Sequence, residues 1–143
     1  MVSVELKPIA LVIQRWTEQG VSLNSAASDA ELLNLRAMIG TDLPPDLAGF
    51  YRIANGMMNN HMDSCNVSFW SIERTLQENN IVQHQERLWI AFGDCLLDSW
   101  FFRISPEGDR TLVLVDSTKE VFASLPDLFE AYVNRPDSLG LLC

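Results

Sequence analysis

Basic side chains are scarce in this sequence. Its 143 residues carry ten lysines and arginines against nineteen aspartates and glutamates, which gives a formal net charge of -9 at pH 7. We expect neither nucleic acid nor an anionic membrane as a partner, because their phosphates repel such a surface. A basic protein, in contrast, is attracted to it.

Cysteine is also scarce, and the three cysteines are Cys65, Cys95 and Cys143. Because their number is odd, their spacing is wide and no C-x-x-C motif occurs, we expect no disulfide framework and structurally neutral thiols in a reducing cytosol. The first eight residues lack the charged region and long apolar core of a secretory signal, and no aliphatic run approaches the ~20 residues of a membrane-spanning helix. These absences predict a soluble, cytoplasmic protein.

Motifs for catalysis and cofactor binding are missing as well. Neither G-x-G-x-x-G nor G-x-x-x-x-G-K occurs, and neither of the two histidines, His61 and His84, lies in a motif that activates a nucleophile. His61, Asp63 and Cys65 alternate, so an extended chain would point all three the same way as metal ligands, but no second ligand pair follows at zinc-finger spacing. We therefore predict no catalytic residues, no metal site and no cofactor.

The chain does contain enough apolar residues for a core. Its hydrophobic fraction is 48% with four tryptophans, which predicts one folded domain spanning residues 1–143. Helical spacing of apolar residues predicts a first helix over residues 6–16, followed by Gly20 as a stop. A second helix begins at Ser28, where the Ser-x-x-Glu spacing is typical of a capping box. A third begins at Pro45 and is expected to close at Asn55-Gly56, with glycine in a left-handed cap.

The second half of the chain contains the predicted strands. Ser71 is expected to cap a fourth helix, and the period then falls towards two in short aromatic and branched runs. Short spacers separate these runs, which favours antiparallel neighbours. The predicted strands span residues 88–92, 100–104, 112–115 and 121–122, and a last helix carries an apolar face from Leu125 to Val133. We predict an α+β domain with helices packed around a short, mainly antiparallel sheet.

Several of these segments resemble one family. The segment LPPDLAGFYRIANG at residues 43–56 closely resembles the "LP-x-x-(L/F)…(F/Y)…NG" signature of the SUKH superfamily. IAFGD at residues 90–94 and VFASLPDLF at residues 121–129 are similar to later motifs of that family, so that the resemblance covers most of residues 28–133. The residues that match the motifs, and that the resemblance makes structural, are Leu43, Pro44, Phe50, Asn55, Gly56, Phe92, Gly93 and Trp100.

The resemblance also implies a function. SUKH domains of this Smi/Knr-like type are shared by bacterial toxin-immunity proteins and fungal cell-wall regulators, so we expect a non-enzymatic protein-binding module. The acidity favours an immunity protein that neutralises a basic toxin, and the alternative is a regulatory or scaffold protein without a toxin target. The chain departs from the family at Leu96-Leu97, where many members carry glycines, so these leucines either fold inward or form a contact surface.

The partner-binding residues are predicted from charge and from exposed apolar anchors. Asp94 and Asp98 flank a turn and fit either acid-base chemistry or, as we prefer, a solvated acidic contact patch. Alternation sends Phe101 and Arg103 to the face opposite Trp100 and Phe102, so Phe101 must be covered by a helix or serve an interface. The full predicted set is Met58, Asp63, Glu86, Asp94, Asp98, Phe101, Glu107 and Asp109.

Overall fold

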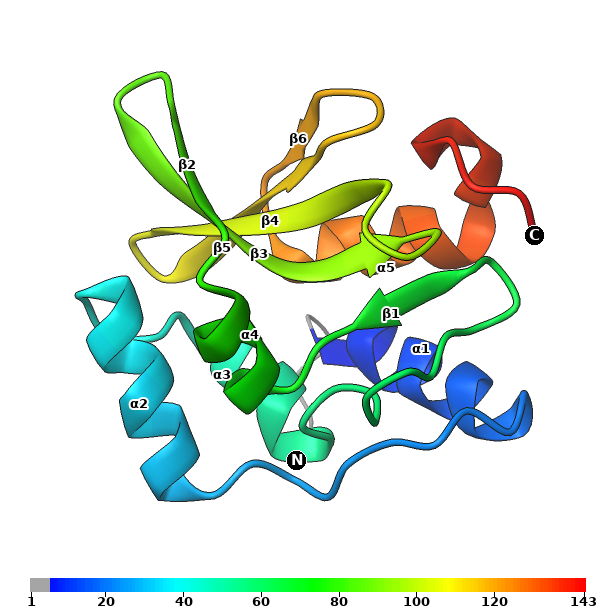
Figure 1. Ribbon diagram of the computed structural model, residues 1–143, viewed down its shortest axis with the longest axis horizontal. Helices are drawn as coiled ribbons and strands as arrows, with labels where there is room; N and C mark the ends of the chain where they lie inside the picture. Colours follow the sequence, from blue (N-terminus) through cyan, green and yellow to red (C-terminus); the bar gives the residue numbers. More distant parts are fainter. Residues whose placement is uncertain (1–5) are drawn as a thin grey trace.

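The computed structural model describes residues 6–143 and shows the predicted α+β fold. Its centre is an antiparallel sheet with strand order β1-β3-β4-β5-β6, in which β1 and β2 pair with opposite ends of β3. Figure 1 shows α1, α3 and α5 on one side of this sheet, while the β2–β3 hairpin stands away from the body. The elements are α1 (Lys7–Glu18), α2 (Asp29–Ile39), α3 (Pro45–Ile53), β1 (Val67–Phe69), α4 (Ile72–Glu78), β2 (Ile81–His84), β3 (Arg87–Cys95), β4 (Trp100–Glu107), β5 (Arg110–Val115), β6 (Glu120–Phe122), α5 (Leu125–Asn134) and the 3-10 helix η2 (Pro136–Leu139).

The predicted helix starts are confirmed. At α2 the Glu31 N–H donates to Ser28 Oγ at 3.1 Å and the Ser28 N–H donates to Glu31 Oε1 at 2.9 Å, which completes the capping box. Ser71 caps α4 by accepting the Arg74 N–H at 3.1 Å. The predicted strands all lie within β3, β4, β5 and β6.

One local prediction is wrong, and the strands β1 and β2 were not predicted. Helix α3 ends at Ile53 with Ala54 extended, so Gly56 is not its left-handed cap. Gly56 does have a positive φ of 67°, and its backbone passes against Trp70, where any Cβ would collide with the carbonyl group. Strand β2 was not expected, since all four of its side chains are exposed and they show no alternation of apolar and polar residues.

The hydrophobic core lies between the sheet and the helices α1, α3 and α5. Phe69 on β1 is at its centre, with its ring 4.9 Å from the Phe102 ring of β4 and 5.4 Å from the rings of Trp16 and Phe129. We call this side of the sheet the inner face. In residues 6–143 no helix is long and apolar enough to cross a membrane.

Candidate functional site

The exposed acidic candidates lie at opposite ends of the sheet. Glu86 is in the turn between β2 and β3, and Glu107 and Asp109 are at the turn between β4 and β5. The antiparallel register brings these two turns to the same end, where Arg87 forms an ion pair with Glu107. Asp98 is exposed at the other end, in the turn between β3 and β4. The structure therefore does not gather the predicted carboxylates into one patch.

Asp63 is not part of the exposed acidic surface, although the sequence suggested that it was. It is only 7% exposed, and its carboxylate accepts hydrogen bonds from Trp16 Nε1 at 3.0 Å and from the N–H groups of Cys65 and Val67 at 2.9 and 3.1 Å. Burial raises the pKa of Asp63, while these donors oppose the rise. Asp63 holds the loop before β1 against α1 instead of facing a partner.

Asp94 is buried as well, so the expected pair of solvated carboxylates at this turn does not form. Asp94 is 3% exposed, its Oδ2 accepts the Asp98 N–H at 3.2 Å, and it lies 3.7 Å from Arg74 Nη2. Burial and the neighbouring Asp98 raise the pKa of Asp94 to about 6, and the Arg74 charge opposes them. Asp94 fixes the β3–β4 turn, and Asp98 alone of the two is exposed.

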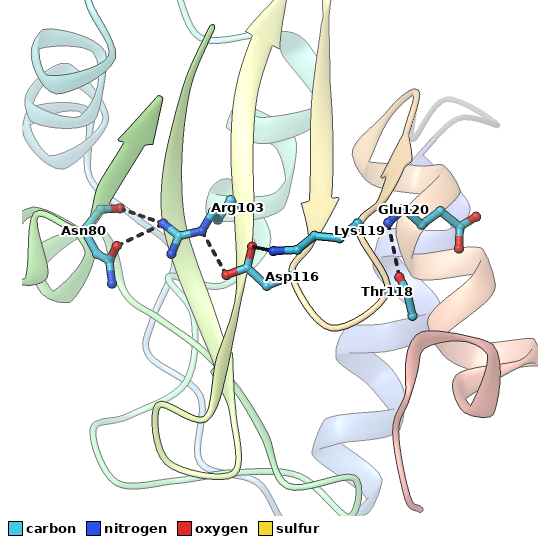
Figure 2. Close-up of polar contacts among 6 residues, drawn as sticks. All are labelled: Asn80, Arg103, Asp116, Thr118, Lys119 and Glu120. Carbon is cyan, nitrogen blue, oxygen red and sulfur yellow. Dashed lines mark hydrogen bonds and ion pairs between the residues drawn. The ribbon is translucent and has the colours of Figure 1, made fainter. Parts of the chain in front are cut away.

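Phe101 lies on the side of the sheet opposite the core, which we call the outer face. Trp70 packs edge-on against its ring at 6.0 Å, and the Arg103 guanidinium lies 5.1 Å from the ring centre. Arg103 is 6% exposed and donates from Nε to Asp116 Oδ2 at 3.1 Å and from Nη1 to Asn80 Oδ1 at 2.9 Å. Figure 2 shows this row running from Asn80 through Arg103 to Asp116, with the Lys119 ammonium 3.9 Å from the same carboxylate. Phe101 is therefore only half-buried, beneath a layer of polar side chains.

The apolar candidates outside the sheet faces are exposed. Met58 is 47% exposed, whereas Met57 beside it is buried and bridges Leu23 and Trp70. Leu96 and Leu97 point outward, with Leu97 75% exposed, and both have positive φ values, of 52° and 53°. The leucines at the family's glycine positions are therefore surface residues.

The alternating triplet does not form a metal site. Asp63 is engaged with Trp16, and Cys65 is bonded to Cys143. Across residues 6–143 no group of three or more His, Cys, Asp and Glu side chains is placed to hold a metal ion. His84 lies exposed on β2, and His61 lies in the loop after α3.

The expectation of three unpaired thiols is wrong. Cys65 and Cys143 form a disulfide with their Cα atoms 4.3 Å apart, because the segment after η2 returns the end of the chain to the loop before β1. The two residues are 78 positions apart, so their spacing gave no sign of pairing. Cys95 is free and buried, and burial raises the pKa of its thiol to about 11, which makes it unreactive.

The residues of the family motif lie in or against the core. Asn55 is buried, donates to Glu31 Oε2 at 2.9 Å and accepts the Ile72 N–H at 2.8 Å, so it joins α2 to the start of α4. Gly93 lies at a shift in the β3–β4 register, where a Cβ would approach the Ser68 carbonyl oxygen to 3.0 Å. Phe50 and Phe92 are fully buried, Pro44 is buried, Leu43 is partly buried, and Trp100 packs on Phe102 at 4.9 Å.

One buried carboxylate of the motif, Asp46, was interpreted from the sequence only as a helix-start residue. Asp46 is buried and accepts hydrogen bonds from the Thr111 N–H and hydroxyl at 3.2 and 2.8 Å and from the Leu125 N–H at 3.0 Å. It therefore ties α3 to β5 and to the start of α5. Its position directly after Pro45 gave a signal for the helix start but none for these long-range contacts.

A comparison with protein families agrees with the fold and the motif geometry. No curated protein matches the chain. A family model matches residues 26–131, from the loop before α2 to within α5, and so includes the Asn55, Gly56 and Gly93 contacts described above. The chain therefore belongs to the SMI1 / KNR4 family (SUKH-1).

Proposed function

We propose that this protein is a non-enzymatic immunity protein that binds and neutralises a basic toxin. Family membership supports a protein-binding role, and the observation that carries the proposal is the net charge of -9. Such a charge accelerates encounter with a basic enzyme through electrostatic steering. Exposed apolar side chains such as Met58 offer the anchor, desolvated on binding, that most interfaces need.

The test is an affinity capture with the tagged protein from lysate of its native host, at low and at high salt. We expect one basic enzyme to be retained at low salt and weakened at high salt, because screening reduces the attraction between opposite charges. The captured enzyme is then assayed with and without the protein, and we expect stoichiometric inhibition. Retention of several unrelated proteins without inhibition would instead support the regulatory role, and an enzyme that is bound but fully active would contradict neutralisation.

A further inference from the structure

A groove runs between α2 and α4, which lie side by side in Figure 1. It consists of two adjoining hollows of about 430 and 380 Å³ that share Glu31 and Glu73 in their walls. The first hollow is polar and extends past Asn59 to Met58, and the second includes Ile72 and Leu76. We call the two hollows together the α2–α4 groove.

The groove carries negative charge without compensation from its own walls. Its two charged wall residues are Glu31 and Glu73, and no lysine or arginine lines either hollow. Arg74, the basic residue of α4, is directed elsewhere, since its guanidinium lies 4.7 Å from the Trp70 ring centre and 3.7 Å from Asp94. The groove is therefore complementary to a cation.

The N-terminal ends of the two helices do not make the groove an anion site. Ser28 already accepts the Glu31 N–H, and Ser71 accepts the Arg74 N–H. The Ile72 N–H is bound by Asn55 Oδ1 at 2.8 Å. These backbone donors, which would otherwise face an anion, are satisfied within the protein.

The carboxylate of Glu31 is held in place before any partner arrives. Its two oxygens accept from the Ser28 N–H and from Asn55 Nδ2, both at 2.9 Å. Each carboxylate oxygen has a second lone pair available for a further donor. A fixed carboxylate loses little conformational entropy on binding, which favours affinity.

We propose that the α2–α4 groove receives an arginine side chain of a basic partner protein. The guanidinium lies between Glu31 and Glu73, and its aliphatic stem packs on Leu76. Arginine fits better than lysine because its planar fork presents several donors that match carboxylate geometry and its stem covers apolar surface. This assignment rests on the proposed function for the identity of the partner, but the groove's preference for arginine is testable without a toxin.

The test is a titration of the ¹⁵N-labelled protein with the peptide acetyl-Ala-Arg-Ala-amide, followed by amide chemical shifts. We expect saturable shifts confined to the first turns of α2 and α4 and to the loop around Asn59. Glu73→Gln should weaken binding about threefold, and the Glu31→Gln/Glu73→Gln double variant about tenfold, as for one and two exposed ion pairs. The peptide with citrulline in place of arginine, which is neutral and nearly isosteric, should give no saturable shifts.

Glu130→Gln is the matched control for Glu73→Gln. Both glutamates are exposed on helices, and each accepts a hydrogen bond from an amide side chain four residues later, from Gln77 and Asn134 respectively. The control changes the net charge equally but should change the affinity by less than about twofold. Three results would overturn the proposal: shifts spread over the whole surface, equal weakening by Glu73→Gln and Glu130→Gln, or no saturable binding. Glu73→Gln does not change the Ser28–Glu31 capping box. This single variant therefore tests the proposal even if the double variant fails to fold.

These outcomes stay separate from the toxin capture. If the arginine peptide does not bind in the groove, this assignment is overturned, and the immunity role is still tested by the capture experiment. Saturable arginine binding without any captured basic enzyme supports the groove and contradicts the proposed function.

Discussion

The two faces of the sheet are closed by different chemistry, although β4 supplies residues to both. Phe102 and Ile104 are fully buried on the inner face beneath helices, whereas Phe101 and Arg103 lie on the outer face. On the outer face Arg103 covers an aromatic ring with its guanidinium while Asp116 balances its charge. A sheet face can thus be closed by paired, amphipathic side chains as well as by a helix layer.

The inner face should be the more sensitive of the two to truncation. Phe102→Ala is expected to lower the free energy of unfolding by about 3–5 kcal/mol, because it leaves a cavity among packed aromatic rings. Phe101→Ala should cost only about 1 kcal/mol, since the ring is half-buried and part of its contact is with the Arg103 guanidinium and not with packed apolar side chains. Urea unfolding of both variants measures the difference. Equal losses would show that the outer layer is packed as tightly as the core.

The disulfide should stabilise the inner face through the end of the chain. Leu139 and Leu141 belong to the core cluster, and the Cys65–Cys143 bond fastens the segment that carries them. Cys143→Ser is expected to lower the free energy of unfolding by about 2–4 kcal/mol, because the open chain regains loop entropy in its unfolded state. Mass spectrometry after alkylation under denaturing conditions should find one free thiol per chain before reduction and three after it. Cys95→Ala, which leaves the bond in place, is the control, and a reductant that does not change the stability of the wild type would contradict this role.

The pH dependence of stability should report on Asp94 near the outer face. Its pKa is raised from 3.8 to about 6 in the folded state, mainly by burial, so the folded protein binds this proton more tightly than the unfolded chain does. The free energy of unfolding should therefore fall as pH rises from about 4 to about 6, by about 3 kcal/mol in total. Asp94→Asn should flatten this part of the curve while it keeps an acceptor for the Asp98 N–H. Urea unfolding at several pH values between about 4 and 6 measures this dependence in both proteins. The assignment would be contradicted if the stability of the wild type rose with pH and Asp94→Asn behaved in the same way.

The sequence predicted the fold better than the partner surface. Helix caps and apolar periodicity are local signals, so Ser28, Ser71 and the β3 to β6 strands were identified from spacing alone. The burial of Asp63 and Asp94 was not, because it depends on the Trp16 N–H and on the Arg74 charge, which lie far away in the chain. An acidic residue in a turn looks the same in sequence whether it faces solvent or a buried donor.

The α2–α4 groove could not be predicted from the sequence for a related reason. Glu31 was recognised only through its capping role, and Glu73 carried no motif at all. Their proximity arises from the packing of α2 on α4, which Asn55 joins through Glu31 and the Ile72 N–H. A hollow formed between two helices has no signature in either helix.

The smallest effects should come from the ion pairs that close the outer face, and they should depend on burial. Asp116→Asn is expected to lower the free energy of unfolding by about 1–2 kcal/mol, because the nearly buried Arg103 loses its counter-charge. Lys119→Ala removes an exposed partner of the same carboxylate and should cost less than about 0.5 kcal/mol, a loss that salt screens further. Urea unfolding at low and high salt separates the two contributions. Comparable, salt-sensitive losses from both variants would mean that solvent reaches the Arg103–Asp116 pair and that the outer face is open. A larger loss from Asp116→Asn than from Lys119→Ala, as predicted, makes Arg103 part of a second, polar core.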